Sequence, residues 1–144
     1  MFALKQALGE KSHDVLVKLT ADSTIAPWAL RALTDREDQL ANVPVQPALA
    51  ALASTDERTR REAVIALARW HGLTGVWADN DTPRGQQVTH TDSLTAHATT
   101  LVPLLADRDA VIAHTAMQVL RQFRALDPVF AAVDRTDSPT LRDG

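Results

Sequence analysis

The chain has 144 residues, of which 45% are hydrophobic, 23% charged and 4% aromatic, and its formal net charge is −3. Its length fits one domain, and its high apolar fraction and small net charge argue against intrinsic disorder. The 24 alanines and 18 leucines, with no tyrosine, favour helices over strands. We therefore predict one all-α domain over residues 1–144.

Several classes of protein and site are excluded or disfavoured. The chain has no cysteine, which excludes disulfides, thiolate zinc sites and cysteine nucleophiles. Its longest apolar run, residues 63–68, is far too short to span a bilayer, and residues 1–11 do not resemble a signal peptide. With 15 basic and 18 acidic residues, no global field attracts a polyanion. We expect no membrane insertion and no general affinity for nucleic acid.

Turn and cap residues divide the chain into short helices. In chain order, we predict helices at residues 1–8, 12–22, 24–35, 48–54, 56–70, 94–107 and 110–125, with a connector at 38–43 and a short helix opened by residues 127–128. Gly9 is expected to end the first helix, Pro27 fits a first helical turn, and Pro103 predicts a bend. The expected helix caps are Ser12, Thr24, Thr55 and Asp109.

An irregular insertion of about 20 residues, 73–92, interrupts this pattern. It contains glycines, a proline and a polar run, together with Trp77. Trp77 either attaches the loop to the helices, which we favour, or is exposed as a binding residue. Trp70 lies on an apolar helical stripe, which is typical of a core residue.

The main pattern in the sequence is an internal repeat. Residues 16–33, 49–67 and 102–120 align, and the last two segments are offset by 53 residues, which include the insertion. Each segment has an apolar helix, a turn marked by aspartate, and a second helix in which alanine precedes leucine by four positions. Such hairpins cannot bury their apolar faces alone, which favours a stacked solenoid. The alternative is an ordinary antiparallel bundle.

The same segments resemble HEAT repeats. Residues 50–56 with 60–67, and residues 104–109 with 116–120, are similar to the family pattern LL-x-D-x-D-x-x-V-R-x-x-A-x-x-A-L. The third segment keeps Asp107, Asp109 and Val111 of the family pattern but has Ile112 where arginine is usual. The second segment keeps only part of the acidic pair, and in the first segment Pro27 and Trp28 interrupt the pattern. The resemblance implies a right-handed α-solenoid of about three hairpins.

Two further segments narrow this resemblance. Residues 28–36 and 113–116 resemble the HEAT segment of large bacterial membrane-bound dehydrogenase-like proteins, which also carry a haem-binding CxxCH domain. The chain has no cysteine, so no haem function carries over. The resemblance implies a scaffold that binds partners along an extended curved surface.

No catalytic or metal-binding motif is present in the sequence. The five histidines lack a metal-ligand spacing, residues 79–81 lack the rest of a calcium loop, and no nucleophile elbow accompanies the serines. We therefore predict no enzyme activity, no metal and no cofactor. We predict a protein-interaction or spacer module within a larger bacterial protein, which binds a protein partner or neighbouring domains of its own polypeptide.

A local basic row supports an alternative function. It consists of Arg58, Arg60, Arg61 and Arg69. Some HEAT-like proteins are DNA glycosylases that hold duplex DNA in a basic groove containing tryptophan. Glu57 and Glu62 interrupt the row, so we favour a solvated helix face over such a groove.

The second helix of each segment, at 24–35, 56–70 and 109–124, is expected to line the interaction surface. The offsets make Arg31, Ile65 and Gln118 equivalent, with Asp35, Arg69 and Gln122 one turn later, and these rows are predicted to be exposed. The candidate surface comprises Arg31, Asp35, Arg61, Arg69, Trp77, His114, Gln118 and Gln122.

The C-terminal end suggests an unfinished solenoid. Ser138 and Pro139 begin a helical pattern that stops after Leu141, whereas a terminal repeat needs a polar outer face. We therefore expect the chain to be a fragment of a longer protein, with residues from about 137 onward poorly packed unless another molecule contacts them.

Overall fold

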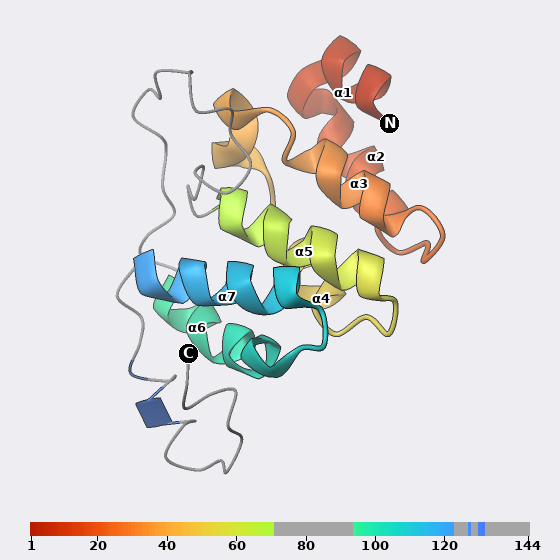
Figure 1. Ribbon diagram of the computed structural model, residues 1–144. Coiled ribbons are helices and arrows are strands. Elements are labelled where there is room, and N and C mark those ends of the chain that lie inside the picture. The colour runs from red at the N-terminus through yellow and green to blue at the C-terminus, as the bar shows by residue number, and fades with distance from the viewer. Residues whose placement is uncertain (71–93, 123–126, 128–129, 132–144) are drawn as a thin grey trace, which may run out of the picture.

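The computed structural model describes residues 1–70, 94–122, 127, 130 and 131, and these residues form helices without strands (Figure 1). The prediction of an all-α chain is confirmed. The elements are α1 (Phe2–Leu8), η1 (Gly9–Ser12), α2 (His13–Leu19), α3 (Ala26–Leu33), η2 (Glu37–Asn42), α4 (Gln46–Ala51), α5 (Glu57–Trp70), α6 (Leu94–Leu101), η4 (Val102–Ala106) and α7 (Ala110–Gln122). The η elements are 3-10 helices.

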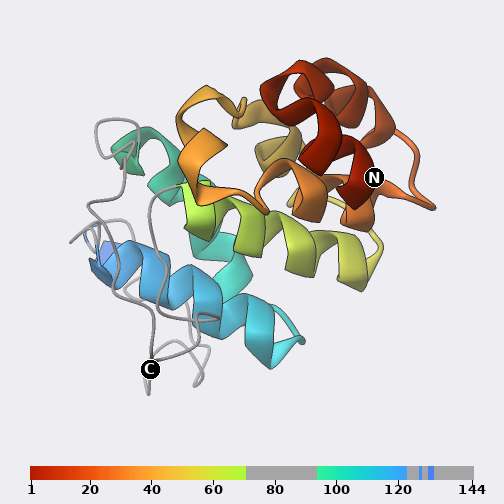
Figure 2. The ribbon, with the colours of Figure 1, turned by 90° about the horizontal axis from the view of Figure 1, so that it is seen from above.

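The helices pack as successive pairs. α2 packs on α3, α4 on α5, and the α6–η4 segment on α7. The second members of the pairs, α3, α5 and α7, lie side by side in chain order, with α5 in the middle (Figure 1). The view from above separates these helices from the first members of the pairs (Figure 2). One face of the molecule is therefore formed by α3, α5 and α7, and we call it the second-helix face.

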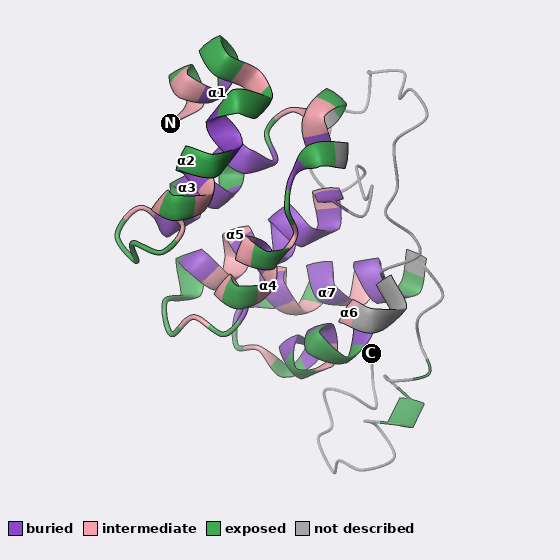
Figure 3. Cartoon of the chain, turned by 180° about the vertical axis from the view of Figure 1, so that it is seen from behind, coloured by how far each residue is buried: buried purple, intermediate pink, exposed green. Residues whose placement is uncertain are grey.

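Burial follows the repeat that the sequence predicts. The three equivalent alanines are 0% exposed, and the leucines four positions later are 0–2% exposed: Ala29, Ala63 and Ala116, then Leu33, Leu67 and Leu120. Figure 3 displays this alternation of buried and exposed residues along the helices. Alanine allows neighbouring helices to approach closely, and leucine fills the space between them.

Two apolar clusters form the core. The larger joins α3, α4, α5, α6, η4 and α7, and the smaller includes Leu16, Leu33, Val43 and Trp70. Trp70 is 8% exposed, and its indole Nε1 donates a hydrogen bond of 2.7 Å to the Val43 carbonyl oxygen. The prediction that Trp70 is a core residue is confirmed.

Aspartates cap two of the second helices, α5 and α7. Asp56 Oδ2 accepts from the Thr59 N–H and Asp109 Oδ1 from the Val111 N–H, both at 2.8 Å. A carboxylate is favoured at this position because it pairs with unsatisfied N–H groups and with the positive end of the helix dipole. Asp22 Oδ1 accepts from the Thr24 N–H at 2.9 Å in the turn before α3, but the N-cap residue of α3 is Ile25, which makes no side-chain capping hydrogen bond. The prediction for Asp109 is confirmed.

The other three predicted caps are wrong. Asp56, the residue after Thr55, caps α5 in its place. Thr24 does not accept a capping hydrogen bond but donates its backbone N–H to Asp22. Ser12 does precede α2, but its backbone is already helical and its hydroxyl donates to the Gly9 carbonyl oxygen at 2.6 Å. Only α5 therefore has a different side chain as its cap; α2 and α3 have no side-chain capping hydrogen bond.

Most of the other residues predicted to begin, end or bend a helix do so in the structure. Gly9 follows α1 with φ of 56°, a conformation that favours glycine, and Pro27 lies in the first turn of α3. At Pro103 the α-helix has already given way to the 3-10 helix η4. The first members of the pairs are shorter than predicted, since α2 ends at Leu19 and α4 at Ala51.

Two predictions lie outside the described residues: the insertion at 73–92 with Trp77, and the C-terminal end from residue 137. Of the short helix opened at 127–128, only residues 127, 130 and 131 are described, and they are helical. Within the described part of the chain, no helix is long and apolar enough to cross a membrane.

Candidate functional site

A cavity of about 290 Å³ opens on the second-helix face. α3 and α7 each contribute one lining residue and α5 contributes four: Arg31, Arg61, Glu62, Ile65, Arg69 and Val111. The sequence analysis placed Arg31, Arg61 and Arg69 on the candidate surface, and the fold brings these three guanidinium-bearing residues together. We call this the arginine cavity.

The floor of the arginine cavity corrects one prediction. Ile65 was expected to be exposed but is only 8% exposed. α5 lies between α3 and α7, so both neighbours cover the middle of its outward row. In the same predicted rows Arg31 and Asp35 are exposed, and Gln118 is half-buried. Ile65 therefore supplies an apolar surface beneath charged side chains.

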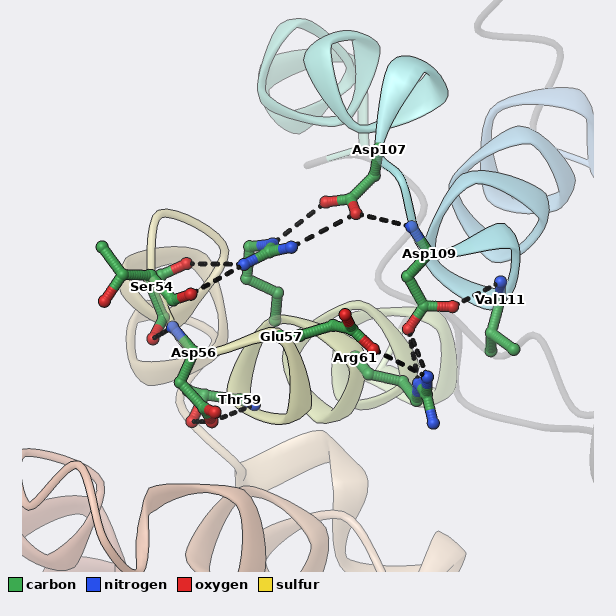
Figure 4. A network of polar contacts seen from close by, with 10 residues as sticks. Ser54, Asp56, Glu57, Thr59, Arg61, Asp107, Asp109 and Val111 are labelled. Carbon is green, nitrogen blue, oxygen red and sulfur yellow. Dashed lines mark hydrogen bonds and ion pairs between the residues drawn. The ribbon is translucent and has the colours of Figure 1, made fainter.

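Arg61 is held on the cavity wall by two carboxylates. Its guanidinium lies 2.6 Å from Asp109 and 3.2 Å from Glu57, which is one helical turn earlier on α5 (Figure 4). The Asp109 side chain is 5% exposed, whereas the Arg61 side chain is 41% exposed. Asp109 thus joins α5 to α7 while its second oxygen caps α7.

A second ion pair lies beside this one, and its arginine is less exposed than Arg61. Arg60 Nε and Nη2 donate to the two carboxylate oxygens of Asp107 at 3.0 and 3.2 Å, while Nη1 donates to the carbonyl oxygens of Ser54 and Thr55. The hydrogen bond from Arg60 lowers the pKa of Asp107, and the same contact raises the pKa of Arg60. We call the contacts of Arg60 and Arg61 with Asp107 and Asp109 the arginine–aspartate bridge.

A cation–π contact joins α3 to α5 instead of an ion pair. The Arg58 guanidinium lies 4.1 Å from the centroid of the Trp28 ring, and Trp28 is 38% exposed. The basic row of the sequence is therefore divided. Arg58 stacks on α3, Arg60 binds Asp107, and Arg61 and Arg69 line the cavity.

The remaining predicted surface residues are dispersed. His114 is exposed on α7 and lies 2.7 Å from the Gln118 amide nitrogen, through its Nε2. The side chain of Gln122 and the whole of Trp77 lie outside the described residues. Sequence reasoning missed Glu62 and Val111 as cavity residues, since only the packing of α5 against α7 brings them together.

A buried basic pair in the N-terminal part of the chain was also missed. Lys5 is 0% exposed, and its ammonium nitrogen contacts Nε2 of His13. His13 Nδ1 lies 3.2 Å from the Asn42 carbonyl oxygen, an acceptor, so Nδ1 carries the proton and Nε2 accepts from Lys5. Burial lowers the pKa of both groups, and the nearby Lys5 charge lowers the pKa of His13 further.

The chemistry available in the arginine cavity is ion pairing and apolar contact. Its lining offers three guanidinium groups, one carboxylate and two aliphatic side chains. No group of three potential metal ligands occurs among the residues that the structure describes. Comparison of the chain with protein-family models, curated proteins and solved structures gives no match.

Proposed function

We propose that this chain is a non-catalytic, HEAT-like helical-repeat scaffold that binds a protein partner on its second-helix face, as an interaction module of a larger bacterial protein. The observation that carries the proposal is the alignment of α3, α5 and α7, with a cavity that takes lining residues from all three. A ligand on this face touches three successive repeats at once. Such a surface suits an extended partner.

The capping aspartates and the equivalent alanines support the solenoid part of the proposal. All three hairpins have a buried alanine followed four positions later by a buried leucine, and the second and third also share an aspartate cap, as expected for units of one repeat. The arginine–aspartate bridge joins the second unit to the third, as stacked hairpins require.

Site-specific photo-crosslinking tests the proposal. A photoreactive amino acid at Arg31 or His114, both exposed on the second-helix face, is expected to crosslink to a protein in cells that produce the chain. The matched control is Asp14, which is exposed on α2, outside this face. Equal crosslinking from Asp14, or none from the second-helix face, would contradict the proposal.

The alternative is a HEAT-like DNA-binding protein or DNA glycosylase. The observation in its favour is the combination of Arg31, Arg61 and Arg69 with the half-exposed Trp28 on neighbouring helices. We favour the protein partner because Arg61 is already paired with Asp109 and Glu57. Binding of duplex DNA that weakens steeply with rising salt would instead support the alternative.

A further inference from the structure

We propose that the arginine cavity receives an acidic side chain of the partner, presented by a segment in which aspartate or glutamate stands next to an aliphatic residue. This inference rests on the proposed function, because it names the chemistry that the second-helix face recognises. Three features of the cavity lead to it: its charge, its floor and its rim.

The charge of the cavity is opposite to that of the chain. The chain carries a net charge of −3, yet three arginines and one glutamate line the cavity. Arg61 is largely neutralised by Asp109 and Glu57. Arg31 is exposed, and its guanidinium makes no hydrogen bond or ion pair with any residue in the described part of the chain. Its fork of N–H donors is suited to bind a carboxylate.

The floor of the cavity adds an apolar requirement. Ile65 is buried beneath the arginines, and Val111 is half-buried at the start of α7. The methylene groups of a glutamate, or the aliphatic side chain next to it, can cover these two residues. A simple inorganic anion leaves them uncovered. The cavity therefore favours an amphipathic ligand over a point charge.

The rim favours a peptide over a nucleic acid. Glu62 lines the cavity, and Asp35 is exposed four residues after Arg31, just beyond the end of α3. These carboxylates repel the closely spaced phosphates of a nucleic-acid backbone. A peptide can place one carboxylate at Arg31 and uncharged residues elsewhere, which avoids this repulsion.

Selection from a library of random peptides displayed on phage tests the inference. The wild-type chain is expected to enrich peptides with aspartate or glutamate next to leucine, isoleucine or valine. A labelled copy of an enriched peptide is then titrated in an anisotropy assay. We expect Arg31→Glu to weaken its binding by about tenfold or more, and Arg69→Gln to weaken it less.

The matched control is Arg121→Glu, which reverses an exposed charge on α7 outside the cavity. It is expected to change the affinity by less than about twofold. Thermal unfolding confirms that each variant folds; Arg31 is exposed, so its replacement leaves the core intact.

Three results would overturn the inference. The first is that the selected peptides are not enriched in acidic residues, and the second is that Arg121→Glu weakens peptide binding as much as Arg31→Glu. The third is that duplex DNA displaces the peptide and that Arg31→Glu weakens DNA binding as much as peptide binding. The crosslinking experiment separates this failure from failure of the proposed function. If Arg31 crosslinks to a partner segment without acidic residues, the scaffold function stands and the acidic-segment inference is wrong.

Discussion

Replacement of Arg60 by alanine tests the arginine–aspartate bridge, which joins α5 to the turn between η4 and α7. The variant removes both hydrogen bonds to Asp107 and the two to the carbonyl oxygens of Ser54 and Thr55. Asp107, whose side chain is 9% exposed, then loses its counter-charge. In the wild-type chain the hydrogen bond from Arg60 lowers the pKa of Asp107, so the variant also removes the main interaction that favours its ionised form.

The exposure of the two side chains sets the expected cost. Breaking a fully buried ion pair costs about 3–5 kcal/mol, and an exposed pair contributes about 0–1 kcal/mol. Arg60 is 20% exposed and Asp107 is 9% exposed, which places this pair between the two limits. We expect Arg60→Ala to lower the free energy of unfolding by about 2–3 kcal/mol. For a domain of this size, the midpoint of thermal unfolding then falls by about 10 °C.

A double-mutant cycle separates the pair from its surroundings. Asp107→Ala also removes the acceptor for the Asp109 N–H, so its own cost exceeds the energy of the ion pair. Urea unfolding of Arg60→Ala, Asp107→Ala and the double variant, followed by circular dichroism, gives the coupling energy, expected at about 1–2 kcal/mol. The control, Arg121→Ala, is expected to cost less than about 0.5 kcal/mol.

Two outcomes would refute this reasoning. The first is that Arg60→Ala is as stable as the Arg121→Ala control. The second is that the costs of the two single variants simply add in the double variant. Acid provides a further check. A lowered folded-state pKa of Asp107 means that the pair stabilises the fold above the ordinary value of 3.8, and this contribution is lost as the pH falls through the folded-state pKa.

Three further predictions concern a cap, a packing position and a buried base. Asp109→Ala removes the α7 cap and the partner of Arg61 and is expected to cost about 2 kcal/mol by urea unfolding, while a cost near zero would contradict the capping role. Ala63→Leu overfills the contact of α5 with its neighbours and is expected to lower the free energy of unfolding by about 1–3 kcal/mol. The control Ala110→Leu, at an exposed position, is expected to be nearly neutral, and equal costs would disprove close helix approach at Ala63. The lowered pKa of His13 predicts a contribution to stability that is present above pH 6.5 and decreases below it, because the unfolded chain binds the proton more readily. His13→Gln is expected to reduce the slope of the free energy of unfolding against pH in this range. An unchanged slope would exclude His13 as its source.

The repeat and its burial pattern were predictable because they depend on local spacing. Alanine followed four positions later by leucine specifies the buried stripe of a second helix, and Ala63 and Leu67 are both 0% exposed. The aspartate turn was also visible in the sequence. The choice of Asp56 over Thr55 as the cap was not, because it depends on which acceptor reaches the Thr59 N–H.

The arginine cavity was predictable only in part. Arg31 and Arg69 follow from the repeat register, because they occupy the outward row of α3 and α5. The burial of Ile65 depends on helices at both sides of α5, which no pattern within one helix reveals. The buried contact of Lys5 with His13 joins α1 to α2 and likewise carries no signal in the helical periodicity.

The two junctions of α5 differ in chemistry, and the arginine cavity depends on both. In the first repeat Ala26 stands where the second has Arg60, and in the second Ser54 stands where the third has Asp107, so the arginine–aspartate bridge has no equivalent between α3 and α5. Arg58 on Trp28 joins those helices instead. The cavity takes one residue from across each junction, so a loss of either contact changes the spacing of its walls. The geometry of the cavity therefore depends on how α3, α5 and α7 are packed.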